Sequence, residues 1–340
     1  PTINVTTDTG GQNFYVNDLC ISLVNLGYKV TILNRGGFNH PVTNQVHKGV
    51  VYYNEVLGEE GNFCRIAYLE DGIPEFVEVK QFTRTNLEKE KEHFFSLAEE
   101  IGLDLDNLLL INSHYWDGGV LGSLINQHLK EIRNKKIPHA WTPHELGRLL
   151  LKDNHSEDFN KIIKFNALDE RLQHEEDILS DIDAFVSTSF KISASLEEYK
   201  NKPRKSVWFP PGVRTSNMKP RKIEECKKSI NLLMELTNKS EEEVIDMINK
   251  NTFFFETSRT SKTKQKDMIL KSFLQLKNKD SILVMNVDPT AEYYKELEEI
   301  HLKANDPRII FIDRYMTDEE KHHLFSLADV YITASLIEGW

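Results

Sequence analysis

The strongest constraint on the fold is an alternation of short strand-like runs with longer segments of helical periodicity. Residues 28–33 (YKVTIL) follow a segment at 12–26 whose apolar residues fall largely on one helical face. The alternation continues along the chain, with strand-like runs at 138–142, 252–256 and 309–312 between amphipathic stretches. Such runs separated by helices are typical of βαβ units, in which the crossovers make neighbouring strands parallel. The sequence therefore predicts an α/β fold built on parallel sheets.

Chain length and a change in composition predict two domains. The chain has 340 residues, close to the size of two domains of about 150 residues each. The segment 201–219 contains three prolines and a glycine, which we expect to interrupt regular structure. We place the junction in this segment and predict domains at 1–205 and 206–340. Residues 221–250 are expected to form a structural pair of helices.

Composition narrows the class of protein. A hydrophobic fraction of 39% with 28% charged residues is typical of globular proteins. The net charge of -11 disfavours nucleic acid as a partner, so a phosphate ligand must be met by a local basic cluster. The three cysteines match neither a disulfide framework nor a metal-ligand spacing, which favours a reducing cytoplasm. No signal-peptide pattern is present, and no apolar run approaches the roughly 20 residues of a membrane span.

The first candidate for chemistry is residues 8–12 (DTGGQ), where two glycines directly precede a predicted helix. Glycine lets a ligand approach the backbone, and the free N–H groups of a helix N-terminus favour an anion such as a diphosphate. Two adjacent glycines are equally consistent with a tight turn. The GxGxxG and GK[ST] spacings are absent, which argues against an NAD-dependent dehydrogenase and a P-loop.

Further motifs follow in order along both halves of the chain. In the first half they are 114–119 (HYWDGG), 142–148 (TPHELGR), Arg171 with Glu175 and Glu176, and 208–213 (WFPPGV). In the second half they are Ser258-Arg259 with Lys264, 318–321 (DEEK), 327–332 (LADVYI) and 335–340 (SLIEGW). With DTGGQ, this ordered set resembles the sucrose-phosphate synthase branch of glycosyltransferase family 4.

The resemblance implies a GT-B fold, in which two Rossmann-like domains with parallel sheets face a central cleft. It implies a retaining transfer of a hexose from a nucleotide-diphosphate sugar to a small sugar, sugar-phosphate or glycerate-type acceptor. UDP-glucose is the expected donor, with GDP-mannose next, and neither a metal nor another cofactor is expected. The DxD-like spacing of Asp104 and Asp106 is interpreted as a capping turn.

The resemblance assigns a donor-binding role to the second domain and to the glycine loop. The glycines cradle the diphosphate, the histidine lies by the transferred sugar, the two cations stabilise the leaving group, and the glutamate organises the hexose hydroxyls. Lys266 is an adjacent substitute for Lys264. The residues that match these positions are Gly10, Gly11, His144, Arg259, Lys264 and Glu338.

The resemblance assigns acceptor binding to the first domain. Simpler interpretations stay open: a loop aspartate such as Asp117 can cap the following helix, and Arg171 with Glu175 can form an i,i+4 pair. A lone histidine in a loop is also often a structural hydrogen-bonder. The residues that match the acceptor side are Gln12, His114, Tyr115, Asp117, Arg148 and Arg171.

Departures from the family pattern leave alternatives open. The second glutamate of the E-x7-E motif would lie beyond Trp340, so we expect the donor domain to be incomplete at its C-terminus. A loop is also expected to be missing before Asp8. Leu149 and Leu150 occupy positions where the family has a basic residue, so the sequence does not predict whether the acceptor carries a phosphate. The alternative is that the chain is a non-catalytic protein, either one that binds a sugar nucleotide or a regulatory protein. Oligomeric state is not predicted.

Overall fold

The structure is a computed structural model that describes residues 11–41, 44–52, 63–152, 167–213 and 218–336. The chain divides into two compact units, one up to Gly212 and one from Val213 onward. The expected junction at 205/206 falls inside a strand of the first unit.

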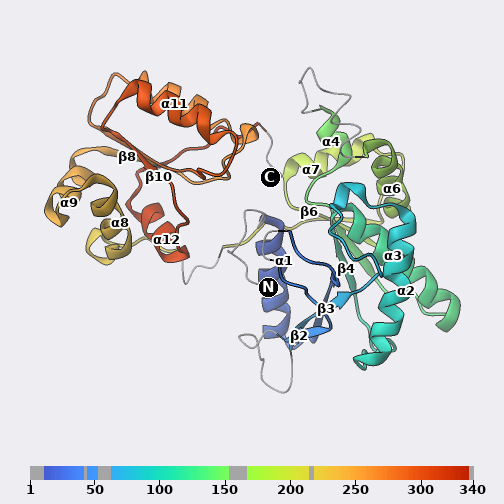
Figure 1. Cartoon of the computed structure of the whole chain (residues 1–340). Helices are drawn as coiled ribbons and strands as arrows, with labels where there is room; N and C mark the ends of the chain where they lie inside the picture. Colours follow the sequence, from blue (N-terminus) through green and yellow to red (C-terminus); the bar gives the residue numbers. More distant parts are fainter. Residues whose placement is uncertain (1–10, 42–43, 53–62, 153–166, 214–217, 337–340) are drawn as a thin grey trace. The chain divides into compact units, whose positions relative to one another are not determined.

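The first unit contains two sheets (Figure 1). The larger is fully parallel in the order β4-β5-β6-β7. In the smaller, β1 pairs with β3 in parallel and β2 pairs with β3 antiparallel, so β2 departs from the expected parallel arrangement. The strands are β1 (Val30–Arg35), β2 (Val50–Tyr52), β3 (Cys64–Leu69), β4 (Ile111–His114), β5 (His139–Thr142), β6 (Ala184–Ser187) and β7 (Lys205–Trp208).

Strand β7 corrects the expectation that 201–219 lacks regular structure. Its four residues lie between Pro203 and Pro210 and contain no proline, so they can pair along their full length with β6. The prolines limit the strand without preventing it.

The helices of the first unit start and stop at recognisable signals. Gly27, with φ of 95°, adopts the left-handed conformation just after α1. Thr83 caps α2 in a capping box with Asn86, and Ser189 caps α7. The helices are α1 (Gly11–Asn25), α2 (Arg84–Glu100), α3 (Tyr115–Arg133), α4 (Gly147–Lys152), α6 (Leu168–Asp181) and α7 (Phe190–Ser195).

Helix α3 begins at Tyr115 and so includes Asp117 and the glycines of HYWDGG, where the sequence predicted a loop before the helix. Two glycines of α3, Gly119 of this motif and Gly122, permit close packing. A Cβ on Gly119 would lie 2.6 Å from Ile178 Cδ1, and one on Gly122 would lie 2.7 Å from His139 Nε2. Glycine is therefore used here for close approach rather than to end a helix.

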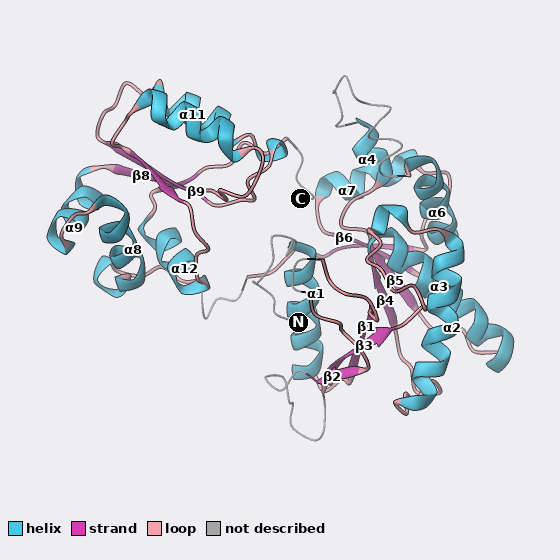
Figure 2. Ribbon diagram, in the orientation of Figure 1, coloured by secondary structure: helices cyan, strands magenta, loops and turns pink. Residues whose placement is uncertain are grey.

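The second unit has one parallel sheet in the order β10-β9-β8-β11, with helices on both faces (Figure 2). The expected helical pair at 221–250 is present as α8 and α9. The strands are β8 (Thr252–Glu256), β9 (Ser281–Asn286), β10 (Ile309–Ile312) and β11 (Val330–Tyr331). The helices are α8 (Lys227–Thr237), α9 (Glu241–Lys250), α10 (Lys266–Leu274), α11 (Tyr294–Ala304) and α12 (Asp318–Leu327).

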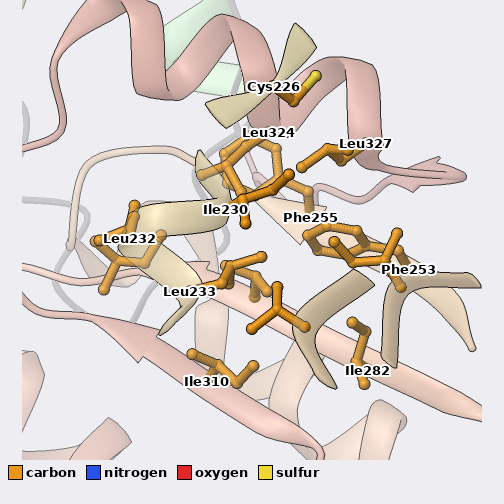
Figure 3. Close-up of a cluster of buried hydrophobic side chains, with 14 of the residues drawn as sticks. Cys226, Ile230, Leu232, Leu233, Phe253, Phe255, Ile282, Ile310, Leu324 and Leu327 are labelled. Atoms are coloured by element: carbon orange, nitrogen blue, oxygen red, sulfur yellow. The ribbon is translucent and has the colours of Figure 1, made fainter. Parts of the chain in front are cut away.

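Alternation along β8 divides the core of the second unit between the two faces of the sheet. Phe253 and Phe255 pack with residues of α8, α9 and α12 in one buried cluster (Figure 3). Phe254, between them, packs with the cluster formed by α10 and α11. This is the period-two pattern of a strand that is covered on both faces.

Candidate functional site

Two histidines from neighbouring strands meet at one edge of the β4–β7 sheet. His114 ends β4, and His144 follows β5. Because the two strands are parallel, their carboxyl ends lie at the same edge, where ligands bind in open α/β sheets. His114 Nδ1 lies 3.0 Å from His144 Nε2, and the rings stack with centroids 5.2 Å apart. We call these two residues the histidine pair.

The backbone at the histidine pair adopts an uncommon conformation. His144 has a φ of 58° and Tyr115, directly after His114, has a φ of 63°. Residues other than glycine rarely adopt this left-handed backbone conformation. Those that do are concentrated at functional sites. The Tyr115 carbonyl accepts a 2.7 Å hydrogen bond from Nε1 of the buried Trp141, which helps to hold this conformation.

Tyr15 of α1 completes the contacts of the histidine pair. Its ring packs edge-on against His144, with centroids 5.1 Å apart, and against His114 at 5.9 Å. Its hydroxyl donates to the Phe209 carbonyl at 3.3 Å. Tyr15 lies three residues after the DTGGQ motif, and the sequence gave it no role. Helix α1, which begins with Gly11 and Gln12, is thereby held at the same edge of the sheet.

Burial keeps both histidines neutral. It lowers the pKa of His114 to about 3, with a further contribution from His144, and it lowers the pKa of His144 to about 4. A hydrogen bond between two neutral imidazoles needs an N–H on one ring and a lone pair on the other. The two rings therefore carry complementary tautomers, which fix their orientations.

Asp117 lies in the first turn of α3. Burial raises the pKa of its carboxyl to about 6, while hydrogen bonds from the backbone N–H groups of Gly118 and Asp117 act in the opposite direction. Asp117 is therefore not the loop cap that one interpretation expected, because the N-cap of α3 is His114 and Asp117 lies inside the first turn. Its contact with an acceptor stays a prediction.

Arg171 organises the residues that follow each histidine. Its side chain is 1% exposed, and its Nε donates to Glu175 Oε1 at 2.8 Å. Its terminal nitrogens donate to the Tyr115 hydroxyl at 3.0 Å and to the Glu145 carbonyl at 2.8 Å. The i,i+4 pair is present, and it belongs to a larger network. Since its donors are directed at protein acceptors, we assign Arg171 to positioning Tyr115 and Glu145.

The two glutamates of the R-x-x-x-E-E helix hold neighbouring loops. The Glu175 carboxylate accepts from the Gly147 N–H at 3.0 and 3.1 Å and from the Tyr199 hydroxyl. Glu176 accepts from the backbone N–H of Lys200 at 3.0 Å and from Arg148 Nη2 at 3.4 Å. Arg148 is only half-buried, so one side of it faces solvent.

The second unit presents its candidate donor residues in the turn after β8. Arg259 is exposed and Lys264 is half-buried, as part of a short 3-10 turn at Lys262–Lys264. Lys266, the adjacent substitute, is 0% exposed and forms a 2.9 Å ion pair with Glu256. Burial lowers the Lys266 pKa and raises the Glu256 pKa.

Lys266 also donates to the backbone carbonyls of Ser258, at 2.7 Å, and Asn286. It therefore anchors the turn from within the protein, whereas Arg259, Lys262 and Lys264 are the cations of this turn that are at least partly exposed. No group of three His, Cys, Asp or Glu side chains among the described residues could hold a metal ion.

Comparison with known proteins gives one curated relative and several solved structures. No family model matches the chain. Mannosylfructose-phosphate synthase of Agrobacterium fabrum is 29% identical over 218 residues, or 63% of this chain and 42% of the relative. The chain thus spans less than half of the length of that relative. Sucrose-phosphate synthase from Thermosynechococcus elongatus has a TM-score of 0.69 at 20% identity, over 97% of this chain and 71% of that chain.

The chain has a GT-B fold, and it is similar to both synthases. Anabaena HepE, solved with UDP-glucose, is a more distant neighbour of this GT-B chain, with a TM-score of 0.52 at 12% identity over 90% of this chain and 74% of that chain. The predicted α/β fold with parallel sheets is confirmed.

The GT-B chain brings together three of the predicted acceptor-side residues, His114, Tyr115 and Arg171, with His144, which the sequence assigned to the transferred sugar. Gly10 and Glu338 lie outside the described residues. Among the described residues, no helix is both long enough and apolar enough to cross a membrane.

Proposed function

We propose that this GT-B chain is a retaining hexosyltransferase that moves a hexose, glucose in preference to mannose, from a nucleotide-diphosphate sugar to a small sugar, sugar-phosphate or glycerate-type acceptor. The neutral histidine pair at the carboxyl edge of the β4–β7 sheet carries the proposal. Its relatives are named as synthases of mannosylfructose phosphate and sucrose phosphate, which supports a phosphorylated sugar as the acceptor. The HepE complex supports UDP-glucose as the donor.

We assign acceptor binding to the first unit and donor binding to the second. His114, Asp117 and Arg148 are the proposed acceptor contacts, together with Gln12 at the start of α1. The exposed side of Arg148 supports a role in binding an anionic acceptor. The three free, buried cysteines support a cytoplasmic location.

His144 is proposed to lie beside the transferred hexose. As the bond to the diphosphate breaks, positive charge develops on the sugar ring. A protonated imidazole would repel this charge, and the buried, neutral imidazole of His144 avoids that repulsion. Hydrogen bonding to His114 holds the ring in one orientation, so its remaining nitrogen is available to a sugar hydroxyl.

Arg259 and Lys264 are proposed to stabilise the leaving diphosphate. The bond from the anomeric carbon to the phosphate oxygen breaks, and its electron pair stays with that oxygen. An acceptor hydroxyl forms the new bond on the same face of the sugar, and its proton passes to the leaving phosphate oxygen. Cations directed at the developing charge lower the barrier to this step, and the start of α1 can supply further N–H donors.

The proposal is tested by calorimetric titration of the purified chain with UDP-glucose, GDP-mannose and ADP-glucose. We expect one nucleotide sugar to bind, and Arg259→Ala with Lys264→Ala to abolish that binding. The matched control is Lys277→Ala with Lys279→Ala, which removes the same charge before the amino end of β9. Failure of all three ligands to bind to the folded chain contradicts the proposal, and binding without turnover favours the non-catalytic alternative.

A further inference from the structure

Two large aromatic side chains of the first unit stack on each other while remaining exposed. Phe190 is 71% exposed and Trp208 is 52% exposed. Their ring centroids lie 4.5 Å apart, with an angle of 26° between the ring planes. Single exposed apolar residues are ordinary, whereas adjoining exposed rings form a patch of the kind that marks binding sites.

The pair lies at the same sheet edge as the histidine pair. Phe190 begins α7, just after β6, and Trp208 ends β7. Strands β6 and β7 are parallel neighbours in which Ser187 stands opposite Trp208. Since all four strands of this sheet are parallel, the aromatic pair and the histidine pair both follow carboxyl ends of one sheet.

Phe209 connects the two pairs. Its N–H donates to the Ser187 carbonyl at 2.9 Å, which extends the β6–β7 contact by one residue. Its carbonyl accepts from the Tyr15 hydroxyl, and its ring lies 6.1 Å from the Tyr15 ring. Tyr15 in turn packs against His144. Phe209, the chain neighbour of Trp208, is therefore joined through Tyr15 to the proposed site of sugar transfer.

We infer that Phe190 and Trp208 form an aromatic surface on which the ring of the acceptor sugar stacks. This inference rests on the proposed function and sharpens its acceptor class. A sugar ring presents one face of C–H groups that can pack on an aromatic face while its hydroxyls remain in water. An open-chain glycerate-type acid has no such face. The acceptor is therefore a ring sugar or its phosphate, not a glycerate-type compound.

Kinetics with two kinds of acceptor test the inference. With the nucleotide sugar that binds, fructose 6-phosphate and glucose 6-phosphate serve as ring acceptors, and glycerate and 3-phosphoglycerate as open-chain acceptors. We expect transfer to a ring acceptor only, and we expect Phe190→Ala to raise its KM by about threefold to tenfold, the size of one aromatic contact. Donor binding should stay unchanged. The control is Tyr28→Ala, which removes a 48% exposed aromatic ring near the amino end of β1.

A binding measurement separates the inference from catalysis. Among the tryptophans that the structure describes, Trp116 and Trp141 are buried and Trp208 is exposed, so Trp208 should contribute a change in tryptophan fluorescence when fructose 6-phosphate is added with UDP. Trp208→Phe keeps an aromatic ring and should lose this signal while keeping the KM.

Efficient transfer to glycerate overturns the inference. An unchanged KM in Phe190→Ala also overturns it, and if the sedimentation of that variant changes as well, the aromatic pair is a protein contact. Failure of the proposed function itself would appear earlier, as the absence of any nucleotide-sugar binding.

Discussion

The candidate sites of the two units achieve their chemistry by opposite means. In the first unit, the histidine pair is withdrawn from water, held neutral and fixed by hydrogen bonds. In the second, Arg259 is exposed and Lys264 half-buried, so both side chains are in contact with solvent. A group that must not repel a cationic sugar gains from burial. A group that must attract a diphosphate has to stay charged and accessible.

Each site is nevertheless supported by a buried ion pair. Arg171 pairs with Glu175 in the first unit and Lys266 with Glu256 in the second, at 2.8 and 2.9 Å. The guanidinium spreads its donors over Glu175, Tyr115 and Glu145, whereas the ammonium joins one carboxylate to two backbone carbonyls. The planar arginine therefore organises side chains, and the compact lysine anchors a turn.

The largest expected effect comes from breaking the buried support of the first site. Arg171→Ala leaves Glu175 buried without its charge partner, so we expect the free energy of unfolding to fall by about 3–5 kcal/mol. Urea denaturation followed by circular dichroism measures this loss. Glu175→Gln, which keeps the shape of the side chain, is the comparison variant. A loss below about 1 kcal/mol for Arg171→Ala would show that the network is dispensable.

Removing the exposed cations should separate binding from stability. We expect Arg259→Ala with Lys264→Ala to reduce transfer by about 10²-fold, the typical cost of losing a preorganised charge contact. Unfolding should change by no more than about 0.5 kcal/mol, because the substitutions lie at the surface. Transfer assays and urea denaturation on one preparation give both numbers. A large stability loss with intact transfer would reverse the assignment.

The neutral state of the histidine pair makes a prediction about pH. The unfolded chain binds protons on these histidines below about pH 6.5, whereas the folded chain resists protonation until about pH 4 for His144 and about pH 3 for His114. Their contribution to stability is therefore fully present above pH 6.5 and is lost as the pH falls toward 4.

We expect His144→Gln to reduce the stability difference between pH 7 and pH 4.5 by about 2 kcal/mol. Urea denaturation of the wild type and the variant at both pH values measures it. An identical pH profile for the two proteins would mean that His144 is protonated as readily in the folded chain as in the unfolded chain.

The smallest expected effect is that of salt on donor binding at the second site. Exposed cations are screened, so we expect donor affinity to fall by about twofold to fivefold when ionic strength rises from about 0.05 to about 0.3 M. Calorimetric titration at both salt concentrations measures this, and the difference should shrink in Lys264→Ala. If donor affinity did not change with ionic strength, the diphosphate would bind away from these cations.

Much of the fold followed from local pattern, and the exceptions have physical causes. Strands 252–256 and 309–312 occur as the sequence predicts. The sequence did not predict β7, because Pro203 and Pro210 indicated irregular structure on both sides of the four residues that form the strand. It placed the start of α3 too late, because residues 114–119 were interpreted as a loop, whereas Gly119 packs closely against Ile178 inside the helix.

For the candidate site too, some features could be predicted from the sequence and others could not. Motif order identified His114, His144 and Arg171 with no knowledge of their contacts. It could not indicate that His114 and His144 share a hydrogen bond, since they are 30 residues apart and meet only through the pairing of β4 with β5. Nor could it distinguish Lys264 from Lys266, which depends on which side chain reaches Glu256.

By itself, the sequence determined the α/β class, the GT-B relationship and the residues of interest. These are encoded in periodicity and motif order, which are local properties of the chain. Only the tertiary structure decided which histidines are neutral, which cation is buried, and that Cys20 and Cys64, distant in sequence, share one buried cluster. Burial and distance set charge states and hydrogen bonds, and both arise only when segments far apart in the chain pack together.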